Sequence, residues 1–364
     1  MSRNMIFPNC KHLKTCRTRL ERSRPKKYNR LILLLFVKTK LVALIVSSII
    51  IVAASTTLLV IFIPKKAPHS ELFQWDYPAN STFSNHYAKI TYMIPMGDGI
   101  RLATDVYLPL YINESKPVIF ARTPYNKNAL SSLAYYAEIG IIVVLQDFRG
   151  FYASEGELTI PFISEQSDGH DTLNWITDQP WCNGKIGNWG LSALGIAQYL
   201  MAPNAPESLV CQFPIVATPN VYSTAFTGGQ LRNELIIPWA EANGFPESTF
   251  DLIQTNEKYG GIWEQGNIGN NYSDINAASI HMGGWYDIFS QNTIDAFTGY
   301  QTEGGIGAAG NAKLIMGPWV HAGMFGFPTG DILFPHQNPG IVIKATDAVF
   351  EKWLLDNSTI WDML

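Results

Sequence analysis

A serine at a tight turn between a strand-like and a helix-like segment is the first candidate for chemistry. In residues 187–195, Gly-Asn-Trp-Gly-Leu-Ser-Ala-Leu-Gly, Ser192 follows an extended run ending near Trp189 and precedes a helical run beginning near Ala193. Small residues around a serine allow the sharp strand-to-helix turn that exposes a nucleophilic hydroxyl. The strict Gly-x-Ser-x-Gly spacing is not met, because position 194 is leucine and the second glycine is Gly195. An ordinary helix N-cap serine therefore remains an alternative at this motif.

A nucleophilic serine needs a base, and the base needs a carboxylate that orients it. Two later segments, each after a strand-like run, supply them: Asp287 lies in a glycine- and aromatic-rich loop, and His321 follows a Gly-Pro turn. The order serine, aspartate, histidine is that of α/β-hydrolases. His281 competes as the base, but it precedes the aspartate. A metal site at these residues is disfavoured, because the chain lacks an HExxH element or a histidine pair at helical spacing, and no cofactor is predicted.

Alternating strand-like and helix-like segments must position these side chains. Extended runs are expected at residues 90–95, 102–108, 117–121, 141–146, 185–189, 209–216, 279–283 and 313–316, and helices at 130–139, 166–177, 193–201 and 343–355. The first two runs flank a Gly-Asp-Gly turn, which is typical of a β-hairpin. The alternation predicts an α/β fold, a mostly parallel sheet flanked by helices. Residues 218–275 interrupt the alternation and are expected to form a short cap insertion over the active site.

A series of ordered motifs across residues 90–357 resembles the CocE/NonD hydrolases, a family of α/β-hydrolase fold that includes esterases and Xaa-Pro dipeptidyl-peptidases. The motifs are the segments 96–109, 122–127, 146–156, 168–184, 190–195, 283–287 and 317–321. The resemblance implies that Ser192 is the nucleophile, His321 the general base and then acid, and Asp287 the group that holds the imidazole tautomer. It also implies an oxyanion hole made by the Tyr125 hydroxyl and the main-chain N–H of Ala193.

The resemblance extends to the substrate pocket, which three aromatic residues, Trp285, Phe289 and Trp319, would line. For Asp147 and Arg149, a buried structural ion pair near the end of the sheet is expected. Two features depart from the family. Alanine stands where a tyrosine usually follows the nucleophile, and residue 364 ends the sequence without the family's C-terminal β-sandwich, so the sequence leaves open whether the chain is truncated.

The N-terminal 64 residues carry a membrane signal. Residues 1–40 hold twelve lysines and arginines against one acid, although the whole chain has a net charge of −4. Residues 41–64 then run for 24 positions without a charge, which is about 36 Å of helix and enough to cross a hydrocarbon core of about 30 Å. Because basic residues precede this segment, we expect a type II signal anchor with a cytosolic N-terminus. A cleaved signal peptide is the alternative.

These features predict a division into a basic cytosolic tail (1–40), a transmembrane anchor (41–64), a stalk (65–88), a luminal or extracellular catalytic domain (89–357) and a C-terminal tail (358–364). The acidic excess after residue 40 argues against nucleic acid as a partner. The expected partners are the lipid bilayer and a small ester, amide or short-peptide substrate. Cys182 and Cys211 form a disulfide bridge or remain two thiols, and the sequence does not decide between them.

The predicted function is that of a membrane-anchored serine hydrolase. It would cleave ester or amide bonds through an acyl-enzyme on Ser192, with Xaa-Pro dipeptidyl bonds as one subclass of substrate. The alternative is a non-enzymatic ectodomain that keeps the hydrolase fold and acts as a binding protein, since a fold does not guarantee a function.

Overall fold

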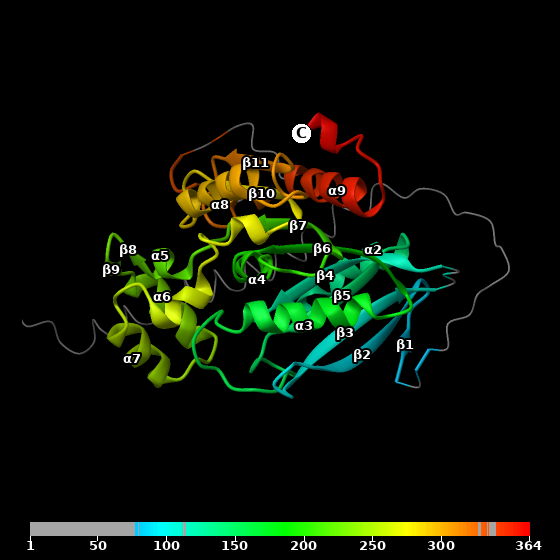
Figure 1. Cartoon of the computed structure of the whole chain (residues 1–364), viewed down its shortest axis with the longest axis horizontal. Helices are drawn as coiled ribbons and strands as arrows, with labels where there is room; N and C mark the ends of the chain where they lie inside the picture. The colour runs from blue at the N-terminus through cyan, green and yellow to red at the C-terminus, as the bar shows by residue number, and fades with distance from the viewer. Residues whose placement is uncertain are drawn as a thin grey trace, which may run out of the picture. The chain divides into compact units, whose positions relative to one another are not determined.

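The computed structural model describes residues 77–364, apart from residues 79, 111, 113, 327, 328, 333 and 335–339. The strands of its main sheet are β1 (Thr82–Phe83), β2 (Tyr87–Pro95), β3 (Arg101–Pro109), β4 (Lys116–Thr123), β5 (Ile142–Asp147), β6 (Cys182–Leu191), β7 (Leu209–Ile215), β10 (Ala278–Gly284) and β11 (Ala312–Gly317). They lie side by side in the order β1-β2-β3-β5-β4-β6-β7-β10-β11 (Figure 1).

The sheet is mostly parallel, as the sequence predicts. Strands β5, β4, β6, β7, β10 and β11 pair in parallel, whereas β1, β2 and β3 add an antiparallel edge. The predicted hairpin is present, with Tyr87 opposite Pro109 and Pro95 opposite Arg101 across β2 and β3. A mostly parallel sheet with flanking helices fits an α/β-hydrolase fold.

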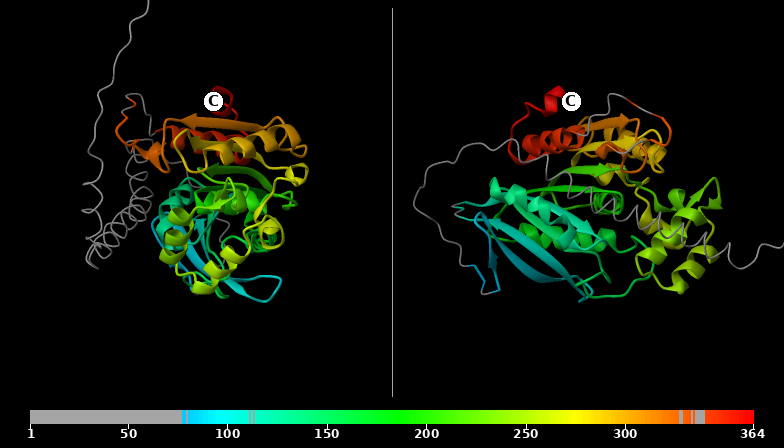
Figure 2. Two further views of the ribbon diagram at one scale, coloured as in Figure 1. Left: turned by 90° about the vertical axis from the view of Figure 1, so that its left-hand side faces the viewer. Right: turned by 180° about the vertical axis from the view of Figure 1, so that it is seen from behind.

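Helices cover both faces of this sheet. They are η1 (Lys127–Ala134), α2 (Tyr135–Glu138), α3 (Glu165–Thr177), α4 (Ala193–Met201), α8 (Ser290–Glu303), η4 (Gly323–Phe325), α9 (Gly340–Leu354) and η5 (Trp361–Met363). Helices α2 and α9 pack on one face, and α3, α4 and α8 pack on the other (Figures 1 and 2). Each face thus has its own hydrophobic layer.

Alternating side chains of the central strands divide between these two layers. In β4, Ile119 joins the cluster under α9 while its neighbour Phe120 joins the cluster under α3. In β5, Val143 and Val144 divide in the same way. Because side chains alternate along a strand, a continuous apolar run fills both layers at once, as in strands buried on both faces.

The cap insertion, residues 218–275, folds into small elements of its own. They are α5 (Val221–Ala225), the paired strands β8 (Phe226–Thr227) and β9 (Gln230–Leu231), α6 (Asn233–Ala242), α7 (Glu247–Thr255), η2 (Gly261–Gly266) and η3 (Tyr272–Asp274). Figure 1 shows α5, α6 and α7 gathered at one end of the sheet. Asn220 and Asn267 pair as an isolated bridge near the two ends of the insertion.

Some elements differ from the sequence expectations. The helix expected at 130–139 is a 3-10 turn followed by the short α2. Helix α8 was not expected, because its buried face consists of Thr293, Ala296, Gly299 and Tyr300 and gives little hydrophobic periodicity. Strand residues begin inside the range predicted as a stalk, with β1 and the first residues of β2.

The predicted anchor and basic tail, residues 1–64, lie outside the described residues. Within the described part of the chain, no helix has the length and apolar character needed to span a bilayer.

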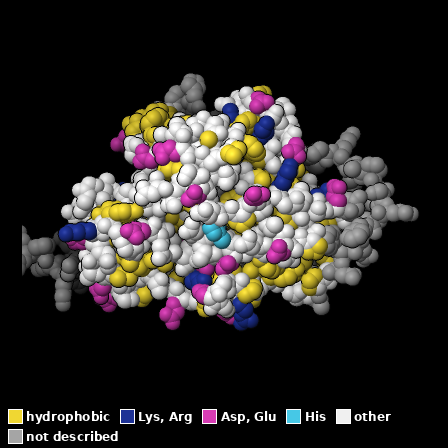
Figure 3. Space-filling view, in the orientation of Figure 1, with side chains coloured by type: hydrophobic (Ala, Val, Ile, Leu, Met, Phe, Trp, Pro, Cys, Tyr) yellow, Lys and Arg dark blue, Asp and Glu magenta, His cyan; other side chains and the backbone are white. Residues whose placement is uncertain are grey.

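Cys182 and Cys211 are free thiols, so the alternative of two unbridged cysteines holds in this structure. Acidic side chains are scattered among apolar ones over the face shown in Figure 3.

Candidate active site

Ser192 lies at a strained turn between β6 and α4. Its φ and ψ angles are 55° and −124°, a conformation that non-glycine residues hold only when the surroundings impose it. Glycines make this turn possible, because a Cβ on Gly190 would lie 2.4 Å from Cβ of Leu194 and one on Gly195 would lie 2.6 Å from Cβ of Ala217. The glycine at position 195 therefore permits the close approach of α4 to the chain after β7.

A continuous hydrogen-bonded chain links the three predicted triad residues. Nε2 of His321 lies 3.0 Å from Oγ of Ser192, and Nδ1 lies 2.7 Å from Oδ2 of Asp287. The residues follow the carboxyl ends of β6, β10 and β11, so the parallel sheet brings together side chains that are up to 129 positions apart. The contact to Asp287 favours the tautomer with the proton on Nδ1, which leaves Nε2 to accept from the serine hydroxyl.

The carboxylate of Asp287 is fully enclosed and has a partner on each oxygen. Its Oδ1 accepts the main-chain N–H of Phe289 at 2.8 Å while Oδ2 faces His321. The ring of Phe289 packs edge-on against the imidazole, with centroids 5.4 Å apart. The loop that contains Asp287 and Phe289 therefore both orients the His321 ring and packs against it.

The competing base, His281, does not reach the serine. It is fully buried in β10, where its ring nitrogens contact the Tyr199 hydroxyl at 2.8 Å and the Ser279 hydroxyl at 2.7 Å. Burial lowers the pKa of His281 to about 3. His281 therefore remains a neutral, hydrogen-bonded core residue.

Main-chain hydrogen bonds join the aspartate loop to the histidine loop. The N–H of Trp285 donates to the carbonyl of Gly317 at 2.9 Å, and the N–H of Tyr286 donates to the carbonyl of Trp319 at 3.0 Å. A Cβ on Gly284 would lie 2.1 Å from that second carbonyl. The two loops therefore touch through their backbones, and the contact requires glycine.

Tyr125, the predicted oxyanion donor, follows β4 and lies beside the serine. Its hydroxyl accepts a hydrogen bond from the indole N–H of Trp239 at 2.9 Å. Burial raises the pKa of Tyr125 to about 12, against the lowering effect of its hydrogen bonds with Trp239 and Ser192. The phenol therefore keeps its proton at neutral pH. The second predicted donor, Ala193, opens helix α4, and the first N–H groups of a helix have no partner within it.

Trp239 is a site residue that the sequence did not single out. It lies on α6 in the cap insertion, 114 positions from Tyr125. The only sequence signal was the aromatic character of the insertion. Of the three predicted pocket residues, Phe289 touches His321, Trp285 is 59% exposed, and Trp319 packs into the hydrophobic cluster under α9. The lining of a substrate pocket by these three side chains stays a prediction.

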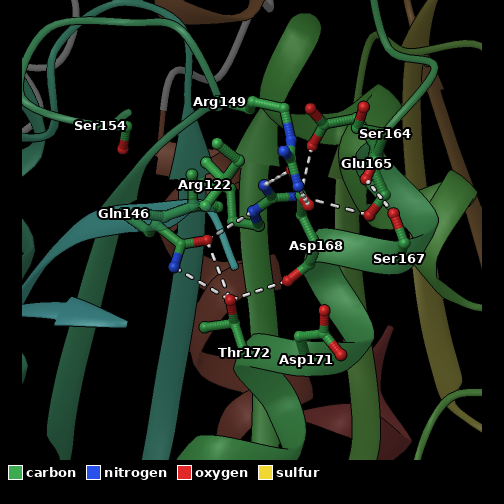
Figure 4. Close-up of polar contacts among 12 residues, drawn as sticks. Arg122, Gln146, Arg149, Ser154, Ser164, Glu165, Ser167, Asp168, Asp171 and Thr172 are labelled. Carbon is green, nitrogen blue, oxygen red and sulfur yellow. Dashed lines mark hydrogen bonds and ion pairs between the residues drawn. The ribbon is translucent and has the colours of Figure 1, made fainter. Parts of the chain in front are cut away.

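A buried network of charges anchors the chain just before Tyr125 (Figure 4). The Arg122 guanidinium donates to Gln146 at 2.8 Å and to the carboxylate of Glu165 at 2.6 Å, and it lies 3.6 Å from Asp168. Burial raises the pKa of Glu165 to about 7, although Arg122 opposes the shift. The network fixes the end of β4 against the start of α3.

The expected ion pair between Asp147 and Arg149 is wrong. Arg149 instead pairs with Asp168 at 2.5 Å (Figure 4), while Asp147 accepts the main-chain N–H of Lys127 at 2.6 Å and faces its ammonium at 3.3 Å. The reason is local. Strand β5 ends at Asp147, and the turn that follows carries Arg149 towards α3.

Known proteins resemble this chain across the site. The sequence profile of the X-Pro dipeptidyl-peptidase (S15 family) matches residues 98–250 and 243–323. Cocaine esterase from Rhodococcus sp. (strain MB1 Bresler) is 26% identical over 296 residues, which cover 66% of this chain and 50% of the esterase. A putative serine esterase of Mycobacterium bovis is 29% identical over 161 residues, or 37% of this chain and 26% of that protein. The chain thus spans at most about half the length of these curated relatives.

Solved structures share the fold. A CocE/NonD family hydrolase from Staphylococcus aureus superposes with a TM-score of 0.62 at 18% identity, covering 76% of this chain and 52% of the other. An aminopeptidase from a marine sediment Thaumarchaeota archaeon superposes with a TM-score of 0.61 at 20% identity, covering 79% of this chain and 58% of the aminopeptidase. An α-amino acid ester hydrolase superposes with a TM-score of 0.54 at 20% identity, covering 79% of this chain and 58% of that hydrolase. These likenesses support the fold predicted from the motifs.

Proposed function

Because this chain belongs to the X-Pro dipeptidyl-peptidase (S15) family, the group of the CocE/NonD hydrolases, we propose that it is a serine hydrolase that cleaves ester or amide bonds through an acyl-enzyme. The observation that carries the proposal is the hydrogen-bonded chain from Ser192 through His321 to Asp287. Its order along the sequence and its place at the carboxyl ends of the strands are those of α/β-hydrolases.

The geometry supports a two-step reaction. Ser192 attacks the carbonyl carbon of the substrate while Nε2 of His321 accepts the hydroxyl proton, and Asp287 stabilises the imidazolium that forms. The negative oxygen of the tetrahedral intermediate receives hydrogen bonds from the Tyr125 hydroxyl and the N–H of Ala193. His321 then returns its proton to the leaving alcohol or amine, and a water molecule releases the acyl group by the same steps.

A fluorophosphonate probe tests the proposal, because it reacts covalently with an activated serine. We expect labelling of the folded protein and its loss in Ser192→Ala. Ser131→Ala is the matched control, since Ser131 is an exposed serine on η1. No labelling of folded protein, or labelling that survives Ser192→Ala, would refute the enzyme and favour a binding role for the fold.

The substrate class within this chemistry is open to direct comparison. We propose that simple esters are turned over, by analogy with the cocaine esterase and the α-amino acid ester hydrolase that the chain resembles. The S15 family is one of X-Pro dipeptidyl-peptidases, so Xaa-Pro dipeptidyl bonds are the other class. Measuring kcat/KM for an aryl ester beside a Gly-Pro anilide decides between them.

We also propose that residues 41–64 anchor the hydrolase to a bilayer, with residues 1–40 in the cytosol. The support is the uncharged run of 24 residues and the twelve basic residues before it. The full chain should stay with membranes in alkaline carbonate, and the domain after residue 64 should be shielded from protease in sealed vesicles. Release by carbonate would refute the anchor without bearing on the hydrolase.

A further inference from the structure

We infer that Trp239, on helix α6 of the cap insertion, is a positioning residue that sets the Tyr125 hydroxyl for its role in the oxyanion hole. The inference rests on the proposed function, which assigns Tyr125 as a donor to the reacting oxygen. Trp239 would act through Tyr125 without touching the reacting atoms. The cap would then contribute to catalysis as well as covering the site.

The chemistry of the two groups fixes which one donates in the hydrogen bond between Trp239 and Tyr125. An indole N–H can only donate, whereas a phenol can donate one hydrogen bond and accept others. Since Nε1 of Trp239 lies 2.9 Å from the Tyr125 oxygen, that oxygen must accept, and its single proton is left for the side of Ser192. The same hydrogen bond lowers the pKa of Tyr125 against the effect of burial. A phenol that already accepts one hydrogen bond is the stronger donor in the other direction.

The indole itself is held between aromatic rings. Phe162 stacks on Trp239 at 5.5 Å with an interplanar angle of 19°, and Phe245 lies against it at 5.8 Å. Asn243 also donates to the main-chain carbonyl of Trp239 at 2.7 Å. The two ring contacts come from the loop before α3 and from the segment just after α6, so they fix the indole from two parts of the chain, while the Asn243 bond holds the backbone of Trp239.

The backbone of Phe162 adds a second, independent observation. Its φ angle is 69°, in the left-handed region that non-glycine residues seldom adopt. Such strain persists where the surrounding structure imposes it, and it is concentrated at functional sites. Here the strained residue stacks on the indole that holds the proposed oxyanion donor. Preorganised donors of this kind avoid reorganisation at the moment of reaction.

Trp239→Phe is the direct test, because it keeps an aromatic ring between Phe162 and Phe245 but removes the N–H. We expect kcat for an aryl ester to fall about tenfold, the size of one hydrogen bond, with KM little changed. Trp263→Phe is the matched control, since that buried cap tryptophan donates to the carbonyl of Asn256 at 2.7 Å instead. Its kcat should stay within about twofold of the parent, since this hydrogen bond is made outside the site. Equal losses in both variants would overturn the inference.

A double-mutant cycle with Tyr125→Phe separates this inference from the proposed function. If Trp239 acts through the phenol, adding Trp239→Phe to Tyr125→Phe costs no further activity. The same fractional loss in both backgrounds, or a parental kcat in Trp239→Phe beside an impaired Tyr125→Phe, would overturn the inference alone. An unchanged kcat in Tyr125→Phe would refute the oxyanion role of Tyr125 and this inference with it.

Phe162→Leu provides a second route if Trp239→Phe does not fold. It removes the stacking partner of the indole and leaves both hydrogen-bonding groups in place. We expect a smaller loss of kcat that disappears in the Tyr125→Phe background. A loss that persists in that background would contradict the coupling. Thermal unfolding of each variant reports separately on stability, which the cycle does not use.

Discussion

The main-chain N–H of Tyr286 donates a hydrogen bond to the main-chain carbonyl of Trp319 at 3.0 Å. Tyr286 belongs to the loop that carries Asp287, and Trp319 belongs to the loop that carries His321, so this bond joins the two loops. Gly284 lies against the same carbonyl, where a Cβ would come within 2.1 Å of the oxygen. The distance between carboxylate and imidazole is therefore set by backbone packing as much as by the side chains.

Gly284→Ala should separate these loops. Since the obstructing atom is a backbone oxygen, the strands or loops must shift, and we expect kcat to fall at least about 100-fold and the free energy of unfolding to fall by about 2 kcal/mol. Ester turnover and chemical denaturation measure the two effects. Gly97→Ala is the control, because its nearest contact would be an ordinary 3.5 Å to Asp171. Near-parental activity in Gly284→Ala would show that the loop contact is dispensable.

Asp287→Asn tests the orienting role of the carboxylate. The amide oxygen can still accept the N–H of Phe289, so the fold should persist, but the contact to His321 no longer favours the required tautomer. We expect kcat to fall about 10⁴-fold, the size of this effect in serine proteases, in steady-state assays of ester hydrolysis. Asp295→Asn, at an exposed carboxylate on α8 hydrogen-bonded by Gln291, should behave as the parent. A loss of less than tenfold in Asp287→Asn would count against the triad.

Glu165 should make the folded domain less stable as pH rises. Burial raises its folded pKa from the usual 4.5 to about 7, so between these values the folded state binds more protons than the unfolded state. Stability from this group is complete below pH 4.5 and is lost as pH rises towards 7, by up to about 3 kcal/mol. Denaturant unfolding measures the free energy of unfolding across this pH range for the parent, for Glu165→Gln and for the exposed Glu247→Gln. Only Glu165→Gln should weaken the dependence of this free energy on pH. An unchanged dependence in that variant would contradict the prediction.

The thiols of Cys182 and Cys211 should behave as two separate groups. Burial raises the pKa of both, and Cys211 is fully enclosed in β7. We expect native alkylation at pH 8 to leave Cys211 unmodified until the protein is denatured, and a reductant to leave the melting temperature unchanged. Peptide mass spectrometry follows each cysteine. A cross-linked peptide containing both cysteines in a non-reduced digest would contradict the free-thiol state.

The sequence could predict the fold, and could single out the three residues that the structure brings into contact, because their signals are local. Each of Ser192, Asp287 and His321 follows the carboxyl end of a strand, and a parallel sheet brings such ends together without further information. The central strands were predictable for the same reason. Helix α8 was not, since small and polar residues form its buried face.

The parts that escaped prediction depend on contacts between distant segments. Trp239 meets Tyr125 across 114 positions, and nothing in the insertion distinguishes its indole from its other aromatic rings. The expected pairing of Arg149 with Asp147 is wrong, because the end of β5 turns the guanidinium towards Asp168 and α3. Side-chain partners at the ends of strands depend on turn geometry, which a pattern of residue types does not specify.

The backbone contact between the aspartate and histidine loops bears on how such an enzyme changes during evolution. Peptide groups make the hydrogen bonds from Trp285 to Gly317 and from Tyr286 to Trp319, so any residue other than proline at 285 and 286 can donate them. The side chains of Trp285 and Tyr286 are 59% and 50% exposed. Mutation can therefore alter these exposed side chains while the spacing of Asp287 and His321 is inherited intact. Under the proposed function, this separates the evolution of specificity from that of reactivity.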